Sequence, residues 1–170
     1  MGKSRVIALS GISSALCLVF IVLGSYVPLL GYSCLIFASV ALLLPLYKNS
    51  LVGGALAYLS SSILAFLLAG FKLDIVLGFA LFFGLYPIVD FLAHKFKLNK
   101  WLALVIKIII FNISFVVLYK FTFLFVIEIE FLQDNFIILI LAFTLLFVLY
   151  DFLMKNVRLY FFRVLNRLKI

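Results

Sequence analysis

Long apolar stretches with almost no charge dominate this chain, and they constrain its fold more than any other feature. Hydrophobic residues make up 68% of the 170 residues, and charged residues only 12%. A soluble globule of this length could not cover its surface with so few polar groups. About 20 helical residues cover the roughly 30 Å hydrocarbon layer of a bilayer. The sequence therefore predicts an all-α integral membrane protein.

Six such stretches predict a six-transmembrane-helix bundle within residues 1–154. Pro28 follows the first stretch and Lys48 follows the second, while Ser50 is placed to N-cap the third. Trp101, a residue that favours the membrane interface, starts the fifth. The predicted spans are residues 6–27, 32–46, 51–70, 74–93, 101–127 and 136–154.

Lysine and arginine gather at alternate ends of these spans. They lie before the first span, between the second and third, between the fourth and fifth, and after the sixth. By the positive-inside rule, both termini face the cytoplasm. Residues 155–170 are predicted to be a basic cytoplasmic tail, which is either an amphipathic helix on the inner leaflet or a stop-transfer flank. The net charge of +8 thus reflects membrane topology and does not indicate nucleic-acid binding.

The first span also resembles a signal peptide, because Lys3 and Arg5 precede an apolar run. Its length and the poor cleavage site around Ser25 favour a transmembrane span. Cys17 and Cys34 fall inside spans, where small apolar side chains fill space, and they predict neither a disulfide nor a metal site.

No catalytic arrangement is recognisable in the sequence. It contains one histidine, no phosphate-binding loop, no cluster with metal-ligand spacing and no nucleophile beside a base. The sequence therefore predicts a protein that is not an enzyme and carries no cofactor or metal. Uphill transport by this chain would need another subunit or an ion gradient.

Besides Lys120 near the outer end of the fifth span, three charged residues lie inside the cytoplasmic halves of the predicted spans: Asp90, Lys107 and Asp151. Counted from the neighbouring basic residues, all three lie roughly 6–10 Å inside the cytoplasmic boundary. Charges at such depth pair with one another, face the protein interior or reach for water. We expect Asp90 to pair with Lys107, with Asp151 as a second partner or a competitor. The cluster is either a structural ion pair or an intramembrane coupling site. Asn112, further along the fifth span, is a candidate for an interhelical hydrogen bond.

Small residues recur along two of the spans. Gly11 and Ala15, with Ala8 one turn earlier, form a short ridge on the first span, where it is free to face another subunit. The third span carries a longer ridge, which we expect to pack helices within the chain. That ridge consists of Gly53, Ala57, Ser61, Ala65 and Ala69.

Aromatic and charged residues gather at the outer ends of the first four spans. Such a mixture suits a small-molecule pocket, although interfacial anchors have the same composition. The candidate ligand-binding residues are Tyr26, Tyr32, Phe71, Lys72 and Asp74.

The chain resembles the substrate-binding S components of energy-coupling factor (ECF) transporters, and more closely a group of uncharacterised bacterial membrane proteins of that build. The resemblance lies in the number and orientation of the spans, the ridge on the first span, and three motifs. In that group the position two residues after the second motif is often basic, whereas here it is Asp90. The motifs are "LGSYVPLL" (23–30), "FFGLYPI" (82–88), and Lys107 with "IIFNI" (109–113).

The resemblance implies a multi-pass protein of the bacterial cell membrane that captures a vitamin-like small molecule near its outer face. It implies that the first helix docks on a transmembrane coupling subunit served by ATPases. In the family an AxxxA motif makes that contact, and the partial match here is Gly11 and Ala15, with Ala8 nearby. The alternative is a non-transporting scaffold of cell-shape or envelope machinery. Both functions place the chain in the lipid bilayer with protein partners.

Overall fold

The computed structural model describes residues 3–68, 72–125 and 136–167, and these residues form helices with no strand among them. The chain divides into two compact units, residues 1–98 and 99–170, and each is described by itself. The prediction of an all-α protein is confirmed over the described ranges.

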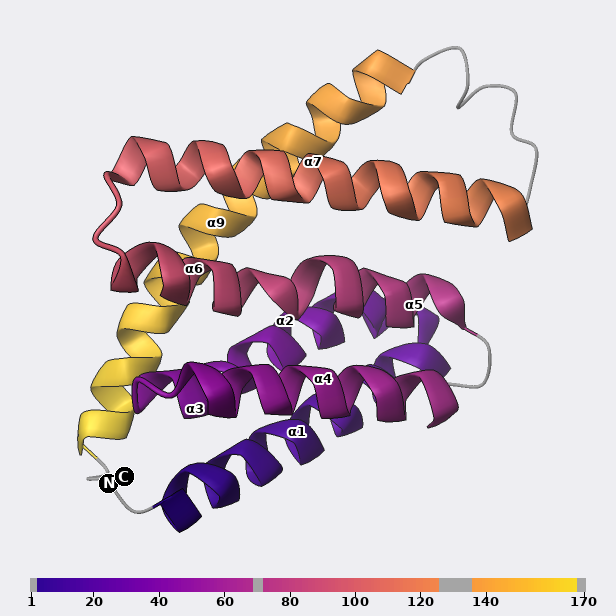
Figure 1. Ribbon diagram of the computed structural model, residues 1–170. Helices are drawn as coiled ribbons and strands as arrows, with labels where there is room; N and C mark the ends of the chain where they lie inside the picture. Colours follow the sequence, from indigo (N-terminus) through magenta and orange to yellow (C-terminus); the bar gives the residue numbers. More distant parts are fainter. Residues whose placement is uncertain (1–2, 69–71, 126–135, 168–170) are drawn as a thin grey trace. The chain divides into compact units, whose positions relative to one another are not determined.

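The first unit contains two long helices and two helical stretches that are interrupted (Figure 1). The long helix α1 packs against both α2 and α4. The elements are α1 (Lys3–Tyr26), η1 (Pro28–Leu30), α2 (Gly31–Ala41), α3 (Leu43–Tyr47), α4 (Leu51–Leu68), α5 (Leu73–Gly78), the π-helix η2 (Phe79–Phe83) and α6 (Leu85–Lys95).

The second unit is a pair of long helices, α7 (Lys100–Phe125) and α9 (Phe136–Arg167). They cross at a steep angle in Figure 1. The fifth predicted span starts one residue after α7, and its last two residues lie outside the described residues. The sixth predicted span coincides with the first part of α9, but the helix does not end at residue 154. It continues to Arg167 without interruption, so the predicted tail begins inside α9.

Five helical stretches among the described residues are long and apolar enough to cross a membrane. The stretch Gly31–Tyr47, which corresponds to the second predicted span, has 17 residues and covers about 26 Å. The prediction of six crossings therefore stays a prediction. Residues 69, 70, 126 and 127 of the predicted spans lie outside the described residues.

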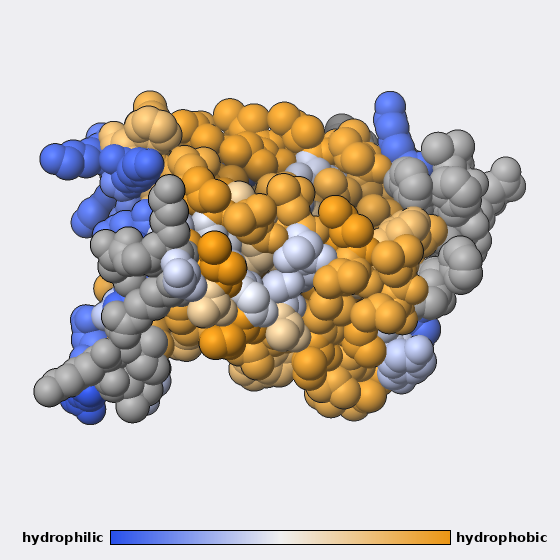
Figure 2. All heavy atoms as spheres, turned by 60° about the horizontal axis from the view of Figure 1, so that its bottom comes forward, coloured by the Kyte–Doolittle hydropathy of each residue, from blue (hydrophilic) through white to orange (hydrophobic). Residues whose placement is uncertain are grey.

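The surface of the first unit is apolar, which suits a hydrocarbon environment. Val52 and Leu67 are each 70% exposed. Figure 2 shows a face on which hydrophobic residues predominate between hydrophilic residues at the two ends of the view. A helix that is apolar on its outer as well as its inner side is typical of a membrane span. The chain is therefore a membrane-embedded helical protein.

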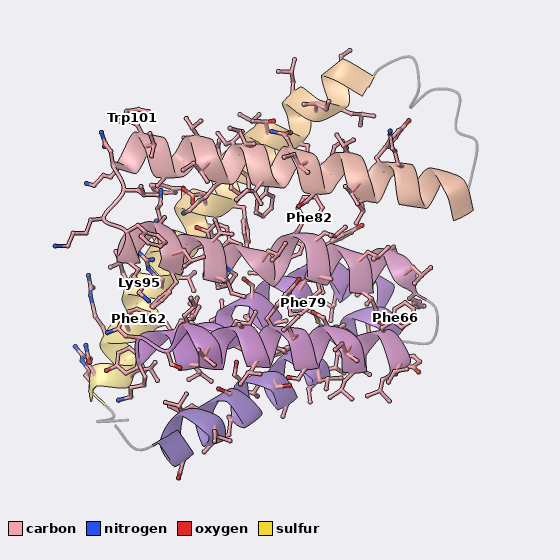
Figure 3. The ribbon with its side chains drawn as sticks, viewed as in Figure 1. Phe66, Phe79, Phe82, Lys95, Trp101 and Phe162 are labelled. Atoms are coloured by element: carbon pink, nitrogen blue, oxygen red, sulfur yellow. The ribbon has the colours of Figure 1, made fainter. Side chains whose placement is uncertain are left out.

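The core of the first unit lies where α1, α2, α4 and α5–η2 meet. Phe79, labelled in Figure 3, is fully buried and faces the ring of Tyr58 with centroids 6.3 Å apart. Small residues line much of the remaining core, so the helix backbones approach closely. A Cβ atom at Gly24 would lie 3.0 Å from the backbone oxygen of Gly31.

A proline explains the break between α2 and α3. Pro45 has no N–H, so the carbonyl oxygen of Ala41 lacks the donor that a continuous helix would supply. The hydroxyl of Ser13 on α1 donates a hydrogen bond of 2.8 Å to that oxygen. Both Ser13 and Ala41 are buried, so the bond satisfies a polar group that water cannot reach.

A second interruption, the π-helix η2, lies just before Pro87 in the fourth predicted span. Here the N–H of Gly84 reaches back five residues to the carbonyl of Phe79 (2.7 Å). The Tyr58 hydroxyl donates to the carbonyl of Ala80 within the same turn (2.7 Å). The motif "FFGLYPI" thus marks a locally widened helix held from outside by α4.

Candidate functional site

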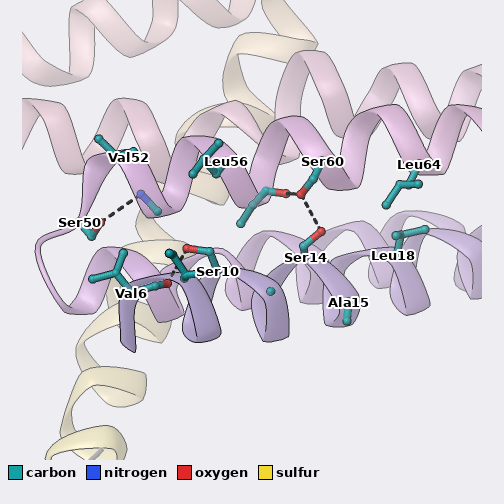
Figure 4. Close-up of a pocket in the computed structure, with 14 residues that line it drawn as sticks. Val6, Ser10, Ser14, Ala15, Leu18, Ser50, Val52, Leu56, Ser60 and Leu64 are labelled. Carbon is teal, nitrogen blue, oxygen red and sulfur yellow. Dashed lines mark hydrogen bonds between the residues drawn. The ribbon is translucent and has the colours of Figure 1, made fainter. Parts of the chain in front are cut away.

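A groove of about 950 Å³ runs between α1 and α4. Figure 4 shows α1 and α4 side by side along it, from Val6 to Leu18 and from Val52 to Leu64. Its walls carry apolar side chains such as Ile7, Leu56 and Leu64, and its polar groups are mainly serine hydroxyls. A lining of this kind favours an apolar occupant and offers a few hydrogen-bonding positions.

Close packing of α1 against α4 forms the floor of this groove. A Cβ atom at Gly53 would lie 2.8 Å from the Ser10 hydroxyl oxygen, so only glycine fits there without a shift. Ser50 accepts a hydrogen bond of 3.0 Å from the Gly53 N–H, which confirms the predicted N-cap of α4. The predicted ridge is buried at Gly53, Ala57, Ser61 and Ala65, while Ala69 lies outside the described residues.

The small residues of α1 have a different environment. Gly11 and Ala15 are exposed and line the groove, and nothing lies within 4 Å of a Cβ atom built at Gly11. Ala8 is exposed as well, but it is not among the lining residues. The structure thus separates the predicted docking set into two residues beside the groove and one outside it.

Two hydroxyls meet at the middle of the groove. Ser14 and Ser60 are 2.8 Å apart (Figure 4), and Ser60 also donates to the carbonyl of Ala57 at 3.2 Å. Either hydroxyl can be the donor of the bond between them. In both cases the Ser14 oxygen keeps lone-pair capacity for a donor in the groove, because a hydroxyl oxygen can accept two hydrogen bonds.

The described candidate ligand residues at the predicted outer end differ in their surroundings: one of the four, Lys72, forms a hydrogen bond to the backbone. Tyr26 and Tyr32 are exposed, at 69% and 65%, and Asp74 is exposed at the first turn of α5. The ammonium of Lys72 donates to the carbonyl of Ser25 near the end of α1, where a cation also complements the helix dipole. This contact gives Lys72 a structural role. Phe71 lies outside the described residues.

The second unit contains a buried charge cluster. The Lys107 ammonium is 2.8 Å from one carboxylate oxygen of Asp151, and the Lys155 ammonium is 2.5 Å from the other. The side chains of Lys107 and Asp151 are 3% and 2% exposed, whereas Lys155 is 41% exposed. The expected contact between Lys107 and Asp151 is present, while the choice between Asp151 as a second partner and Asp151 as a competitor of Asp90 stays a prediction. Lys155 was not foreseen as a member, although its i+4 spacing from Asp151 is a recognisable signal.

Asp90 is buried in the first unit, at 3% exposure. Its backbone carbonyl is 2.9 Å from Nδ1 of His94, and its carboxylate is 3.8 Å from the same nitrogen. The structure does not place the two units relative to one another, so the pairing of Asp90 with Lys107 stays a prediction.

A seam of paired residues continues from the charge cluster along α7 and α9. Phe111 faces Phe147 with ring centroids 4.0 Å apart, and Phe115 faces Phe143 at 4.4 Å. These pairs advance by four residues along α7 and retreat by four along α9. Rows of i±4 side chains pack helices at large crossing angles, as α7 and α9 show.

Asn112 makes the predicted interhelical bond within this seam. Its side-chain oxygen accepts a hydrogen bond of 3.2 Å from the Thr144 hydroxyl. Thr144 also donates to the carbonyl of Ile140 at 2.8 Å, so its hydrogen is shared between two acceptors. The aromatic pairs were not foreseen, although phenylalanines at i, i+4 spacing on both helices are their signal.

No metal-binding group of three or more histidine, cysteine or acidic side chains occurs among the residues that the structure describes. Cys17 and Cys34 are free and buried. Comparisons with protein families, curated proteins and solved structures found no match.

Proposed function

We propose that this chain is a membrane-embedded subunit that receives a transmembrane helix of a partner protein in the groove between α1 and α4. The observation that carries the proposal is the exposed pair Gly11 and Ala15 beside that groove. Small residues allow a helix backbone to approach closely, and such contacts drive association within membranes. The corresponding small residues of α4 are already covered, so the exposed pair on α1 is the surface left for a partner.

The chemistry of the groove favours a helix over a lipid acyl chain. The oxygen of Ser14 has lone pairs available, and an acyl chain offers no donor to it. A close-packed helix offers serine or threonine hydroxyls and polarised Cα–H groups. The proposed partner is therefore a transmembrane helix with small and hydroxyl-bearing residues on one face.

The resemblance to S components gives this docking a function, which is uptake of a small, vitamin-like molecule. In that scheme the partner is the transmembrane coupling subunit and its ATPases supply the energy. The ligand is captured at the opposite ends of the helices, near Tyr26, Tyr32 and Asp74. The alternative function, a scaffold of cell-shape or envelope machinery, uses the same groove for a different partner.

Native mass spectrometry of the gently extracted protein tests these functions together. A bound small molecule and a coupling subunit with ATPases are the expected result for a transporter subunit. Co-purification of envelope or cytoskeletal proteins without a small molecule would overturn the transport function and support the scaffold.

Docking itself is tested by Gly11→Leu and Ala15→Leu, with Ala8→Leu as the matched control on the same helix. Each groove variant should lower partner affinity, because overpacking costs about 1–3 kcal/mol, or about 5- to 150-fold. The chain should remain folded, since a side chain at Gly11 enters open space. Unchanged assembly, or an equal loss for Ala8→Leu, would show that the groove is not the docking surface.

A further inference from the structure

The helix α9 is longer than a membrane requires. Its 32 residues span about 48 Å, against roughly 30 Å of hydrocarbon. The sequence 152–170 contains five basic residues and no acidic residue. The C-terminal part of α9 is therefore a positively charged helix that continues directly from a membrane-spanning one.

The contact between Lys107 and Asp151 is a reference point for both helix ends. Lys107 lies seven residues from Lys100, the first residue of α7, and Arg158 lies seven residues beyond Asp151 on α9. Trp101, at the first turn of α7, is 77% exposed (Figure 3), and an exposed tryptophan is typical of the membrane interface. Beyond Arg158, α9 continues for nine residues, 159–167, or about 14 Å.

The exposed side chains change character along this part of α9. Phe152 is 69% exposed, Leu159 53% and Tyr160 70%. Arg163 and Arg167 follow, both exposed and one helical turn apart. Lys155, which is partly exposed, lies one turn before Leu159, and beyond Tyr160 the exposed side chains are polar or basic, as is typical of the headgroup level of a leaflet.

We propose that the end of α9 is a binding site for anionic phospholipid headgroups, formed by Arg163 and Arg167 with Tyr160 at the hydrocarbon boundary. The planar guanidinium fork matches the geometry of a phosphate. Lys155 is already held by Asp151, so the arginines further along the helix are the groups that contact the lipid. The inference is independent of the docking function.

The test uses the full-length chain in phosphatidylcholine nanodiscs with spin-labelled phosphatidylglycerol or phosphatidylcholine. The wild type should prefer phosphatidylglycerol, and Arg163→Gln or Arg167→Gln should each lower that preference about fivefold, because a basic residue near an anionic surface contributes about 1 kcal/mol. Lys120→Gln, a neutralised exposed cation far along α7, is the control and should leave the preference unchanged.

Several results would overturn the inference. The wild type could show no preference, the arginine variants could retain it, or Lys120→Gln could lower it equally, which would indicate net charge alone. Loss of the preference in millimolar inorganic phosphate at constant ionic strength would show a site for free phosphate instead. Both arginines are exposed, so neither substitution should change the thermal unfolding of the protein. Measuring the unfolding of each variant verifies that its fold is intact.

Discussion

The carboxylate of Asp151 binds two lysines with different access to water. Lys107 is buried on α7, whereas Lys155 is partly exposed on the same helix as Asp151. Lys155 can turn toward the headgroups when its partner is removed, as long cationic side chains do near helix ends. Lys107 has no such route at 3% exposure. The two substitutions that break this ion pair should therefore have unequal effects.

Asp151→Asn should destabilise by up to about 3–5 kcal/mol, because it removes a carboxylate from the buried Lys107. Lys107→Met should cost less, since Lys155 still neutralises Asp151. The double substitution should recover part of the summed loss, and this non-additivity is the measure of contact. The measurement is the free energy of unfolding in mixed detergent micelles, and strictly additive effects would contradict the observed bond.

A second cycle with Asp90→Asn and Lys107→Met examines the pairing predicted from the sequence. If the effects of the two substitutions on the free energy of unfolding are non-additive, Asp90 also contacts Lys107. Additive effects would leave Asp151 as the carboxylate that holds Lys107. Loss of transport with recovered stability would instead make the cluster a coupling site.

Some of these residue roles could be predicted from the sequence and others could not. Charges and an asparagine inside apolar spans require partners, so Lys107, Asp151 and Asn112 were identifiable. The role of Ser13 was not, because its acceptor is a carbonyl released by a proline 32 positions away. Such a bond depends on how α1 packs against α2, and spacing within one helix carries no information about it.

At the scale of elements, the break between α2 and α3, where the Ser13 hydroxyl binds the carbonyl of Ala41, leads to a testable prediction. Ser13→Ala should cost about 1–3 kcal/mol, because it leaves the carbonyl of Ala41 buried without a donor. Adding Pro45→Ala should recover most of that loss, since the new N–H can donate to the same carbonyl. Thermal unfolding in detergent measures both variants. A double variant as unstable as Ser13→Ala alone would show that the carbonyl is satisfied in another way.

Helix positions were largely predictable from the sequence, because uncharged runs in this chain coincide with helices. The end of α9 was not. Lysines and arginines after residue 154 indicate where the hydrocarbon ends, but they are good helix formers and do not end the hydrogen-bonded backbone. The end of the hydrocarbon and the end of the helix are thus separate properties. The charge pattern predicts where the hydrocarbon ends, but it does not predict where the helix ends.

At the scale of the whole molecule, the short stretch Gly31–Tyr47 decides between five and six crossings. Cysteines introduced at Leu29, Asn49, Asp74 and Asn99 occupy exposed positions at or near the ends of the long helical stretches. With six crossings and a cytoplasmic N-terminus, Leu29→Cys and Asp74→Cys should react with an impermeant thiol reagent in intact cells. Asn49→Cys and Asn99→Cys should react only after permeabilisation.

The two native cysteines should not contribute to the labelling signal. Cys17 and Cys34 are 0% and 9% exposed, and buried thiols of this kind are inert, so the parent chain is the control. Labelling of Asn49→Cys from the same side as Leu29→Cys would show that Gly31–Tyr47 does not cross. Reaction of Asn99→Cys in intact cells would reverse the predicted orientation.

The bond between Lys107 and Asp151 also has a consequence for biosynthesis. The two residues are 44 positions apart, so α7 leaves the ribosome before the helix that carries its carboxylate. A lysine costs about 2.5–3.5 kcal/mol at the centre of a helix on insertion scales and less toward an end, where Lys107 lies, and the apolar residues of α7 must outweigh that cost at the translocon. The α7–α9 hairpin reaches its final electrostatic state only once α9 has been synthesised and inserted beside α7.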